Sequence, residues 1–376
     1  MTTTRSQKPS LLLHATALLC LVTAAPACAT ARPAPADRAA PRAAPRRPQQ
    51  KDMAVDAATR ARVVDVLVRE LRERYVFPEK AQALEGVLRA RQRAGAYDAV
   101  QSAEAFAVAL TRDMREAVQD GHLHVAYSEA PLPEQTGKQE PSAEQLAGMR
   151  NEVARLNAGF ERVERLPFNI GYLDLRAFAP ADLAAPKVAA AMVLLADTRS
   201  LIIDLRKNGG GEPEAVAQMA SYFFDQRTHL NDIYWREGEH TVEMWTRTDV
   251  AGPRYGTERK VYLLTSHDTF SAAEDFSYAM KNLRRATLVG EVTGGGAHPG
   301  DMRRLDTHFG AFIPMGRSIS PVTHTDWEST GVEPDVKAAA KDALNVAQTL
   351  ILQEHLASEK DPATLERMRA RLQELR

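Results

Sequence analysis

The sequence predicts an α/β fold that follows a small helical region, and three observations indicate this. Before residue 120, apolar residues recur every three to four positions, as they do on one face of a helix. After residue 169, short apolar runs alternate with helical segments, which is typical of a fold built around a parallel sheet. The chain has 376 residues, of which 44% are hydrophobic, so it can bury a substantial core.

The first 30 residues are expected to be a signal peptide. A basic start precedes an apolar stretch from about Leu11 to Ala25, and the small-residue run Ala25-Pro26-Ala27 follows. Basic, apolar and small residues in this order are typical of secretory signals. We therefore expect an exported protein, either periplasmic or secreted.

Both cysteines, Cys20 and Cys28, lie in this segment, so residues 31–376 cannot form a disulfide among themselves. Cys28 follows small residues and could carry a lipid as the first mature residue, which would tether the protein to a membrane. Residues 31–51 are rich in Pro, Ala and Arg and are expected to form a linker. The net charge of −1 does not indicate a nucleic-acid partner.

Residues 52–130 are expected to form a helical N-terminal domain. The first helix begins near Val55 and is broken by Pro78, and a second helix is expected at 79–94. A third helix starts after Ser102 and stops at Asp120-Gly121, where Gly121 suits a left-handed C-terminal cap.

Residues 131–356 are expected to form the α/β domain, and residues 357–376 a charged C-terminal helix. The pattern predicts strands at 169–178, 260–266 and 285–293, and at 200–211 a strand that runs into a glycine turn. It predicts helices at Ala143–Leu156, Pro186–Ala196, Glu214–Phe224 and Ala272–Leu283. Pro186 suits the first position of its helix, where no N–H is needed.

Ser271 lies where a predicted strand meets a predicted helix, and two interpretations apply to it. Ser271-Ala272-Ala273-Glu274 fits the capping box Ser-x-x-Glu. A serine at this place could also be a nucleophile, because the unpaired N–H groups of a helix start can stabilise an oxyanion. The Gly-x-Ser-x-Gly motif of α/β-hydrolases is absent from the sequence.

A nucleophilic serine needs a base. No lysine occurs between Lys281 and Lys337, so the strand that follows the serine helix offers none. The histidine candidates are His122, His124, His267, His298, His308 and His324. His122 stands out because it directly follows Gly121, where the chain leaves the helical region; the alternative is an exposed loop histidine.

Two glycine-rich turns and one loop carboxylate complete the candidates. The run of glycines at 209–211 follows a strand and permits close backbone approach, so it could supply a second oxyanion N–H or be a plain turn. The loop at 290–301 is expected to cover the site. Glu328 could orient a histidine or a water, or be a solvated loop residue. A phosphate-binding loop is not indicated, because Gly-x-x-x-x-Gly-Lys is absent.

Four stretches in this order resemble the tail-specific, or C-terminal-processing, serine peptidases: LIIDLRKNGGG, LLTSHDTFSAAEDF, ATLVGEVTGGGAHP and SISPVTHTDWESTGVEPDV. The branch that they resemble most contains the repeats of interphotoreceptor retinoid-binding protein and the core of tricorn protease. YVFPEKA and VQDGHLHVAYSE extend the resemblance over about residues 55–340.

The resemblance implies a site. It matches Ser271 to the nucleophile, His122 to the base and Glu328 to the acidic residue of the histidine-type site. It matches Ala272, with either Gly209 or Gly210, to the oxyanion hole. The lysine of the family's other branch is replaced by glycines at 294–296, and Gly121 stands where tricorn has a serine.

The resemblance also implies a crotonase- or ClpP-like ββα spiral with a helical N-terminal domain, and no stretch resembles a PDZ domain. The first functional hypothesis is an exported serine peptidase that acts on a peptide or protein through an acyl-enzyme. No metal or organic cofactor is implied, because the sequence has no Cys/His cluster at ligand spacing. The second hypothesis is a catalytically weak or inactive binding protein for an apolar ligand or peptide on the same scaffold.

Overall fold

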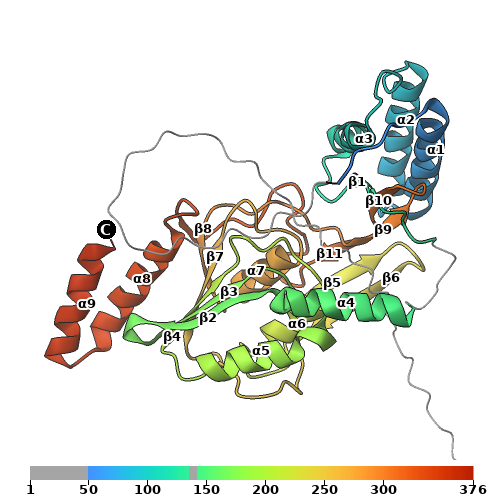
Figure 1. Cartoon of the computed structure of the whole chain (residues 1–376). Coiled ribbons are helices and arrows are strands. Elements are labelled where there is room, and N and C mark those ends of the chain that lie inside the picture. Colours follow the sequence, from blue (N-terminus) through green and yellow to red (C-terminus); the bar gives the residue numbers. More distant parts are fainter. Residues whose placement is uncertain (1–49, 135–141, 376) are drawn as a thin grey trace, which may run out of the picture.

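A six-stranded sheet forms the centre of the computed structural model, which describes residues 50–134 and 142–375 (Figure 1). Five of its strands are parallel, and β2 pairs antiparallel with β3 at one edge. The strands, in their order across the sheet, are β12 (Val336–Lys337), β8 (Thr287–Gly290), β7 (Lys260–Thr265), β4 (Ser200–Asp204), β3 (Ile170–Leu175) and β2 (Phe160–Leu166).

Helices cover both faces of the central strands of this sheet. Neighbouring residues of a strand point to opposite faces, so they enter two different cores. Leu201 and Ile203 of β4 belong to a core that includes residues of α5, α6 and α7. Ile202 between them belongs to a second core that includes residues of α8 and α9. The covering helices are α5 (Ala181–Leu195), α6 (Pro213–Ala220), α7 (Ala272–Asn282), α8 (Ala343–Ser358) and α9 (Pro362–Glu374). The predicted α/β fold is therefore confirmed.

The predicted position of Pro186 at the start of its helix is wrong. Helix α5 begins at Ala181, and Pro186 lies inside it. The preceding turn joins the helix because Ala181 and Ala184 are buried in the core beneath it. Tertiary packing thus outweighs the backbone hydrogen bond that a proline removes from a helix interior.

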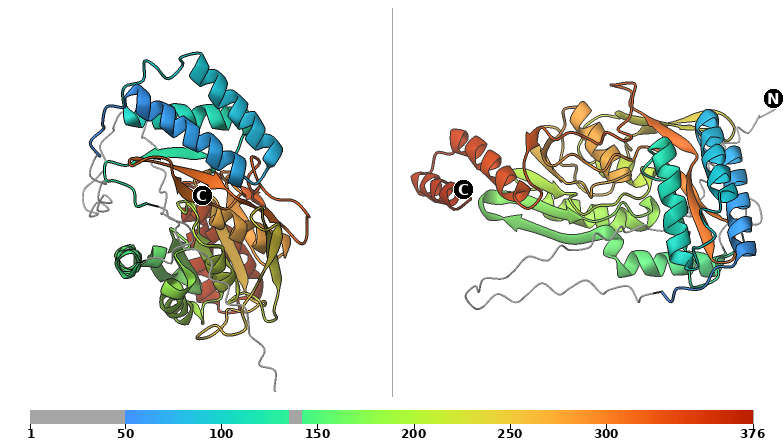
Figure 2. Two further views of the ribbon diagram at one scale, coloured as in Figure 1. Left: turned by 90° about the vertical axis from the view of Figure 1, so that its right-hand side faces the viewer. Right: turned by 90° about the horizontal axis from the view of Figure 1, so that it is seen from above.

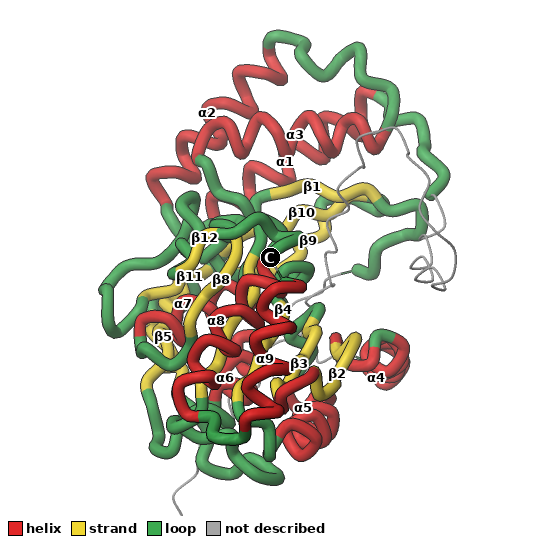
Figure 3. The backbone as a smooth tube through the Cα atoms, turned by 90° about the vertical axis from the view of Figure 1, so that its left-hand side faces the viewer, coloured by secondary structure: helices red, strands yellow, loops and turns green. Residues whose placement is uncertain are grey.

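Three helices form a second layer at one end of the molecule: α1 (Ala57–Arg74), α2 (Pro78–Arg93) and α3 (Ala103–Val118). They lie on a three-stranded sheet in the order β1 (His124–Tyr127), β10 (Phe309–Pro314) and β9 (Gly300–Arg304), as Figure 3 shows from another side. Phe309, Ala311 and Ile313 of β10 complete the core of the helices. The helical region therefore shares its core with strands that the sequence patterns did not predict.

Helix α3 ends at Val118, and its left-handed cap lies two residues before the predicted glycine cap. Gln119, with φ 52°, adopts the left-handed conformation, and its N–H bonds to the Arg115 carbonyl oxygen. The expectation that Gly121 is the cap is wrong, and Gly121 has an ordinary φ. The earlier turn leaves Asp120, Gly121 and His122 in a short connection between α3 and β1.

The remaining elements lie around this frame. A third sheet has the order β11 (Gly316–Ile319), β5 (His229–Trp235) and β6 (His240–Trp245). Helix α4 (Ala143–Arg155) precedes β2, and short 3-10 turns lie at Asn157–Gly159 and Pro167–Asn169. Figure 2 shows α8 and α9 at the end of the molecule opposite to α1–α3. Across the residues that the structure describes, none of the helices has the length and apolar character needed to cross a membrane.

Candidate active site

Ser271 directly precedes α7, beyond the end of β7. Its backbone has φ 56° and ψ −122°, a combination that is rarely adopted by a residue with a side chain. Such a backbone costs on the order of 1–3 kcal/mol and persists only where the surroundings enforce it. The strain indicates that this position serves something other than packing.

The buried carboxylate of Glu274 enforces this backbone conformation. It accepts hydrogen bonds from the Ser271 N–H at 2.8 Å and from the Thr293 hydroxyl at 2.5 Å. It also accepts from the N–H groups of Gly295 at 2.7 Å and Gly296 at 2.8 Å. Burial raises the pKa of Glu274 to about 7, even though these hydrogen bonds favour the ionised form. The Glu274 half of the expected capping box is present, since its carboxylate accepts from the Ser271 N–H, and the same carboxylate fastens the second glycine-rich loop to the serine.

The first glycine-rich turn lies against Ser271. A Cβ added to Gly210 would be 2.7 Å from the Ser271 Cβ, so only glycine fits there. The Gly210 N–H donates to the Asn208 side-chain oxygen at 2.9 Å. Within residues 50–134 and 142–375, the N–H groups of Gly209 and Ala272 have no hydrogen-bond acceptor. Of the two candidate glycines, Gly209 is therefore the one with an unengaged amide.

His122 lies against Phe270, the residue before Ser271, and aromatic rings hold its imidazole. Its ring centroid is 4.6 Å from that of Phe270 and 5.6 Å from that of Phe312. Because Phe270 directly precedes Ser271, the fold brings positions 122 and 271 into one region. In the part of the chain that the structure describes, no hydrogen bond joins the imidazole to the Ser271 hydroxyl, and Nδ1 has no partner. Burial lowers the pKa of His122 to about 4, so the ring is neutral at pH 7.

The backbone on both sides of His122 is tied down by polar groups. The Arg115 guanidinium donates to the carbonyl oxygens of Gly121 at 2.6 Å and Leu123 at 2.8 Å. The Ser329 hydroxyl donates to the Gln119 carbonyl oxygen at 2.7 Å. The connection that carries His122 is thus held from α3 on one side and from the loop after Glu328 on the other.

Glu328 bonds to the chain next to His122 and not to its imidazole. Its carboxylate accepts from the Gly121 N–H at 3.1 Å and from the Ala297 N–H at 2.5 Å. Burial and the nearby charge of Asp120 raise its pKa to about 7. The histidine that Glu328 contacts is His298, whose Nδ1 lies 3.4 Å from the carboxylate.

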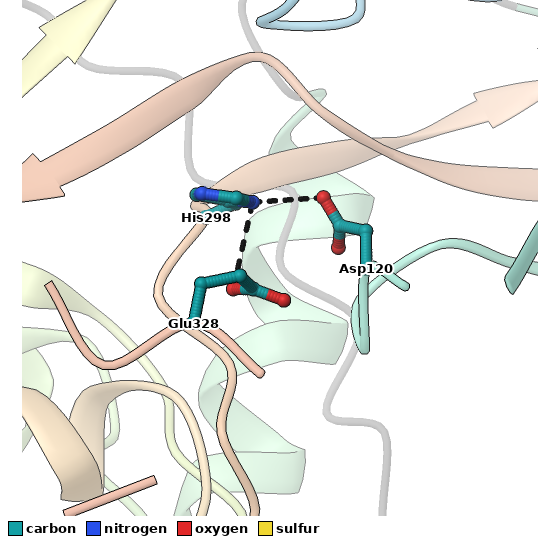
Figure 4. Close-up of side chains that lie close together, drawn as sticks. All are labelled: Asp120, His298 and Glu328. Carbon is teal, nitrogen blue, oxygen red and sulfur yellow. Dashed lines mark hydrogen bonds and ion pairs between the residues drawn. The ribbon is translucent and has the colours of Figure 1, made fainter. Parts of the chain in front are cut away.

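Asp120 and His298 are polar groups of the site that contact each other (Figure 4). The sequence analysis did not predict this contact. One Asp120 oxygen accepts from the His122 N–H at 3.0 Å. The other accepts from the Tyr75 hydroxyl at 2.9 Å and from His298 Nδ1 at 2.8 Å. His298 was only one of six candidate bases, and its partner is 178 positions away, so no local pattern joins the two.

Asp120, His298 and Glu328 each offer one ligand atom, and these atoms lie within 4.8 Å of one another, as a metal ion would require. Hydrogen-bond donors already satisfy both carboxylates, however. Tyr75 donates to Asp120 and Ala297 donates to Glu328, while the 2.8 Å separation of Asp120 and His298 is that of a hydrogen bond. The geometry therefore favours an ion pair over a metal centre.

The other candidate histidines have separate roles. His124 Nδ1 contacts the His122 carbonyl oxygen at 2.8 Å, and its ring stacks on Phe312. His308 Nδ1 contacts the Ser128 carbonyl oxygen at 2.9 Å. His267 and His324 are exposed.

Known proteins resemble the chain over most of its length. The profile of Peptidase family S41 matches residues 169–338, and that of the N-terminal domain of Peptidase_S41 in eukaryotic IRBP matches residues 27–163. Carboxyl-terminal-processing peptidase 2, chloroplastic, of Arabidopsis thaliana is 26% identical over 175 residues, which are 44% of this chain and 31% of that protein. The carboxyl-terminal-processing protease of Synechocystis sp. is 29% identical over 169 residues, which are 44% of this chain and 37% of that protein.

The chain thus spans about a third of the length of these curated relatives, 31% and 37%. Among solved structures, a lipoprotein from Streptococcus agalactiae is similar with a TM-score of 0.52 and 14% identity. The match covers 77% of this chain and 95% of the lipoprotein. At this identity the likeness shows a common fold.

Proposed function

The chain belongs to peptidase family S41, and on that premise we propose that it is a serine peptidase with Ser271 as its nucleophile. The observation that carries the proposal is the strained backbone of Ser271 next to the glycine turn, where the N–H groups of Gly209 and Ala272 have no acceptor among the described residues. A hydroxyl held at this point, next to the positive end of α7, is suited to attack a carbonyl group.

In the proposed reaction, the Ser271 oxygen bonds to the scissile carbonyl carbon, and the hydroxyl proton passes to His122. The N–H groups of Gly209 and Ala272 stabilise the oxyanion; one such donor typically contributes about 10²- to 10³-fold in kcat. The C–N bond then breaks, and His122 returns the proton to the leaving amine. Water repeats the cycle on the acyl-enzyme and frees the serine.

We propose that substrate binding completes the contact between Ser271 and His122. Burial holds the pKa of His122 at about 4, so the imidazole is unprotonated at pH 7 and can accept the hydroxyl proton. Among the described residues the imidazole is held by its contacts with the rings of Phe270 and Phe312, and a substrate that displaces Phe270 would allow it to turn. Catalytic hydrogen bonds often tighten only in the substrate complex. Glu328 acts on His122 indirectly, through the Gly121 N–H.

We propose that the substrates are peptides or proteins. We also propose that the protein is exported. Support for export comes from the basic and apolar segment at residues 1–30, and for a lipid tether from Cys28. These residues, like residues 31–49 of the expected linker at 31–51, lie outside the described ranges 50–134 and 142–375.

The second hypothesis, a binding protein for an apolar ligand or peptide, is favoured by one observation. In the described residues the Ser271 hydroxyl and the His122 imidazole are not hydrogen-bonded, and two phenyl rings enclose that imidazole. A site that only binds needs no such hydrogen bond.

A fluorophosphonate probe separates the two hypotheses. For a peptidase, we expect labelling of the intact protein that Ser271→Ala abolishes and His122→Ala slows, together with cleavage of a peptide library that follows the same order. Folded protein that neither reacts with the probe nor cleaves peptides, but binds an apolar fluorophore saturably, would be a binding protein. Unchanged labelling and turnover in His122→Ala would remove the imidazole from the mechanism.

A further inference from the structure

The buried cluster of Asp120, His298 and Glu328 lies directly behind the proposed base. We propose that His298, as an imidazolium ion, is the positioning residue that fixes His122 by holding the two carboxylates that accept the backbone N–H groups of Gly121 and His122. This inference rests on the proposed peptidase function, and the experiments below separate the two.

Each carboxylate joins His298 to the connection that carries His122. Asp120 accepts the His122 N–H at 3.0 Å with one oxygen and contacts His298 Nδ1 at 2.8 Å with the other. Glu328 accepts the Gly121 N–H at 3.1 Å with one oxygen, and its other oxygen lies 3.4 Å from the same nitrogen. One ring nitrogen therefore ties together the acceptors of two successive backbone amides.

His298 itself is firmly held. Its side chain is 3% exposed, and its ring meets the edge of Phe77 with centroids 5.2 Å apart. The preceding residue, Ala297, donates its N–H to Glu328 at 2.5 Å. A displacement of His298 would therefore be transmitted to both carboxylates and, through them, to His122.

Charge gives this imidazole a role that a neutral side chain could not fill. Asp120 is buried and the Glu328 side chain is only 10% exposed, and within the described parts of the chain His298 is the only cation that forms an ion pair with either of them. The other titratable groups that face the cluster are Tyr75, Arg115, His122 and Asp326. Arg115 binds the carbonyl oxygens of Gly121 and Leu123 instead of the carboxylates.

The protonation states agree with this arrangement. Burial opposes the charged form of His298, but the hydrogen bond to Asp120 and the charges of Asp120 and Glu328 outweigh it and raise the pKa. Burial likewise opposes ionisation of Asp120, but the hydrogen bond and charge of His298 outweigh it and lower the pKa. As the pH rises through the raised pKa of His298, the cation is lost and two carboxylates are left facing each other. The backbone of His122 should then loosen at alkaline pH.

The test replaces His298 by asparagine, which keeps an N–H donor near the place of Nδ1 but carries no charge. His355→Gln is the matched control, because His355 is also buried, at 4% exposure, and contacts the Ser200 hydroxyl through Nε2 at 2.9 Å. It lies on α8, whose apolar residues belong to the core that contains Ile202. Thermal melts establish that both variants fold.

The activity measurement is the pH profile of kcat and KM on a fluorogenic peptide that the wild type cleaves. We expect His298→Asn to lower kcat by about 10²-fold, which is typical of a displacement of about 1 Å in a catalytic group, with KM unchanged. The alkaline decline of kcat should disappear in this variant and persist in His355→Gln. A wild-type kcat and alkaline decline in His298→Asn would overturn the inference and leave the proposed nucleophile intact.

A second readout does not depend on activity. We expect hydrogen exchange at the amides of Gly121 and His122 to be slow in the wild type and in His355→Gln, and fast in His298→Asn. Intrinsic amide exchange becomes faster as the pH rises. In the wild type we expect the exchange of these two amides to increase by more than this intrinsic effect. Equal protection in His298→Asn and the wild type would refute the inference even if the protein cleaved no peptide, whereas failure of cleavage alone would count only against the peptidase.

Discussion

Gly296 offers the sharpest test of how closely the site is packed, through the substitution Gly296→Ala. The glycine lies in the loop that Glu274 fastens to Ser271. An added Cβ would be 2.2 Å from Cζ of Phe270, 2.4 Å from Cε2 of the same ring and 2.7 Å from Cε1 of His122. Its φ is not positive, so alanine meets no backbone penalty and the effect is purely steric.

The size of the effect follows from these distances. Carbon atoms pack at about 3.5–4.0 Å, so the Phe270 ring must move by about 1 Å or more. Overpacking of this kind costs about 1–3 kcal/mol in the free energy of unfolding. Because the same ring holds His122, we also expect the labelling rate of Ser271 to fall about 10²-fold.

Urea unfolding and the rate of fluorophosphonate labelling measure the two effects. Gly86→Ala is the matched control: Gly86 lies on α2, no atom is within 4 Å of an added Cβ, and alanine should stabilise the helix by about 1 kcal/mol. Adding Phe270→Leu to Gly296→Ala should restore part of the lost stability. Wild-type stability and labelling in Gly296→Ala would refute the packing described for this loop.

Three further outcomes are expected. The Glu274 carboxylate accepts from four donors, and Glu274→Gln replaces one of its two oxygens by an NH₂ group that cannot accept. The substitution should therefore lower the free energy of unfolding, measured in urea, by about 1–3 kcal/mol; an unchanged midpoint of urea unfolding would contradict this. The labelling rate of Ser271 should rise with pH through about 4, the lowered pKa of His122, and a midpoint near the unperturbed 6.5 would assign the base elsewhere. Pro186→Ala, at an exposed position inside α5, should raise the melting temperature because it restores a helical hydrogen bond, and a lower melting temperature would count against this.

The parts of the fold that could be predicted are those that local pattern determines. Strands β4 and β7 read as continuous apolar runs because both faces of the sheet are covered. Ser271 could be placed at the start of α7 because Glu274 follows it at the spacing of a capping box. Each of these signals spans fewer than a dozen residues.

The features that could not be predicted depend on contacts between distant segments. Strand β10 (Phe309–Pro314) contains Gly310 and Pro314, so it carries little of the usual strand signal, and the helices that cover it lie far earlier in the chain, at residues 57–118. Gln119 takes the left-handed cap that Gly121 was expected to supply, because Gly121 must direct its N–H to Glu328. The contact of Asp120 with His298 leaves no trace in either neighbourhood of the sequence.

The shared core of α1–α3 and β10 bears on how the chain can be divided or recombined. A fragment that starts at residue 142 would leave Phe309, Ala311 and Ile313 without the helices that cover them. It would expose an apolar surface that is prone to aggregation. Conversely, the three helices grafted onto another protein would lack the strand residues on which they pack. A chimera with a relative should therefore transfer the hairpin at 300–314 together with the amino-terminal helices. These two separate stretches of sequence form one structural unit.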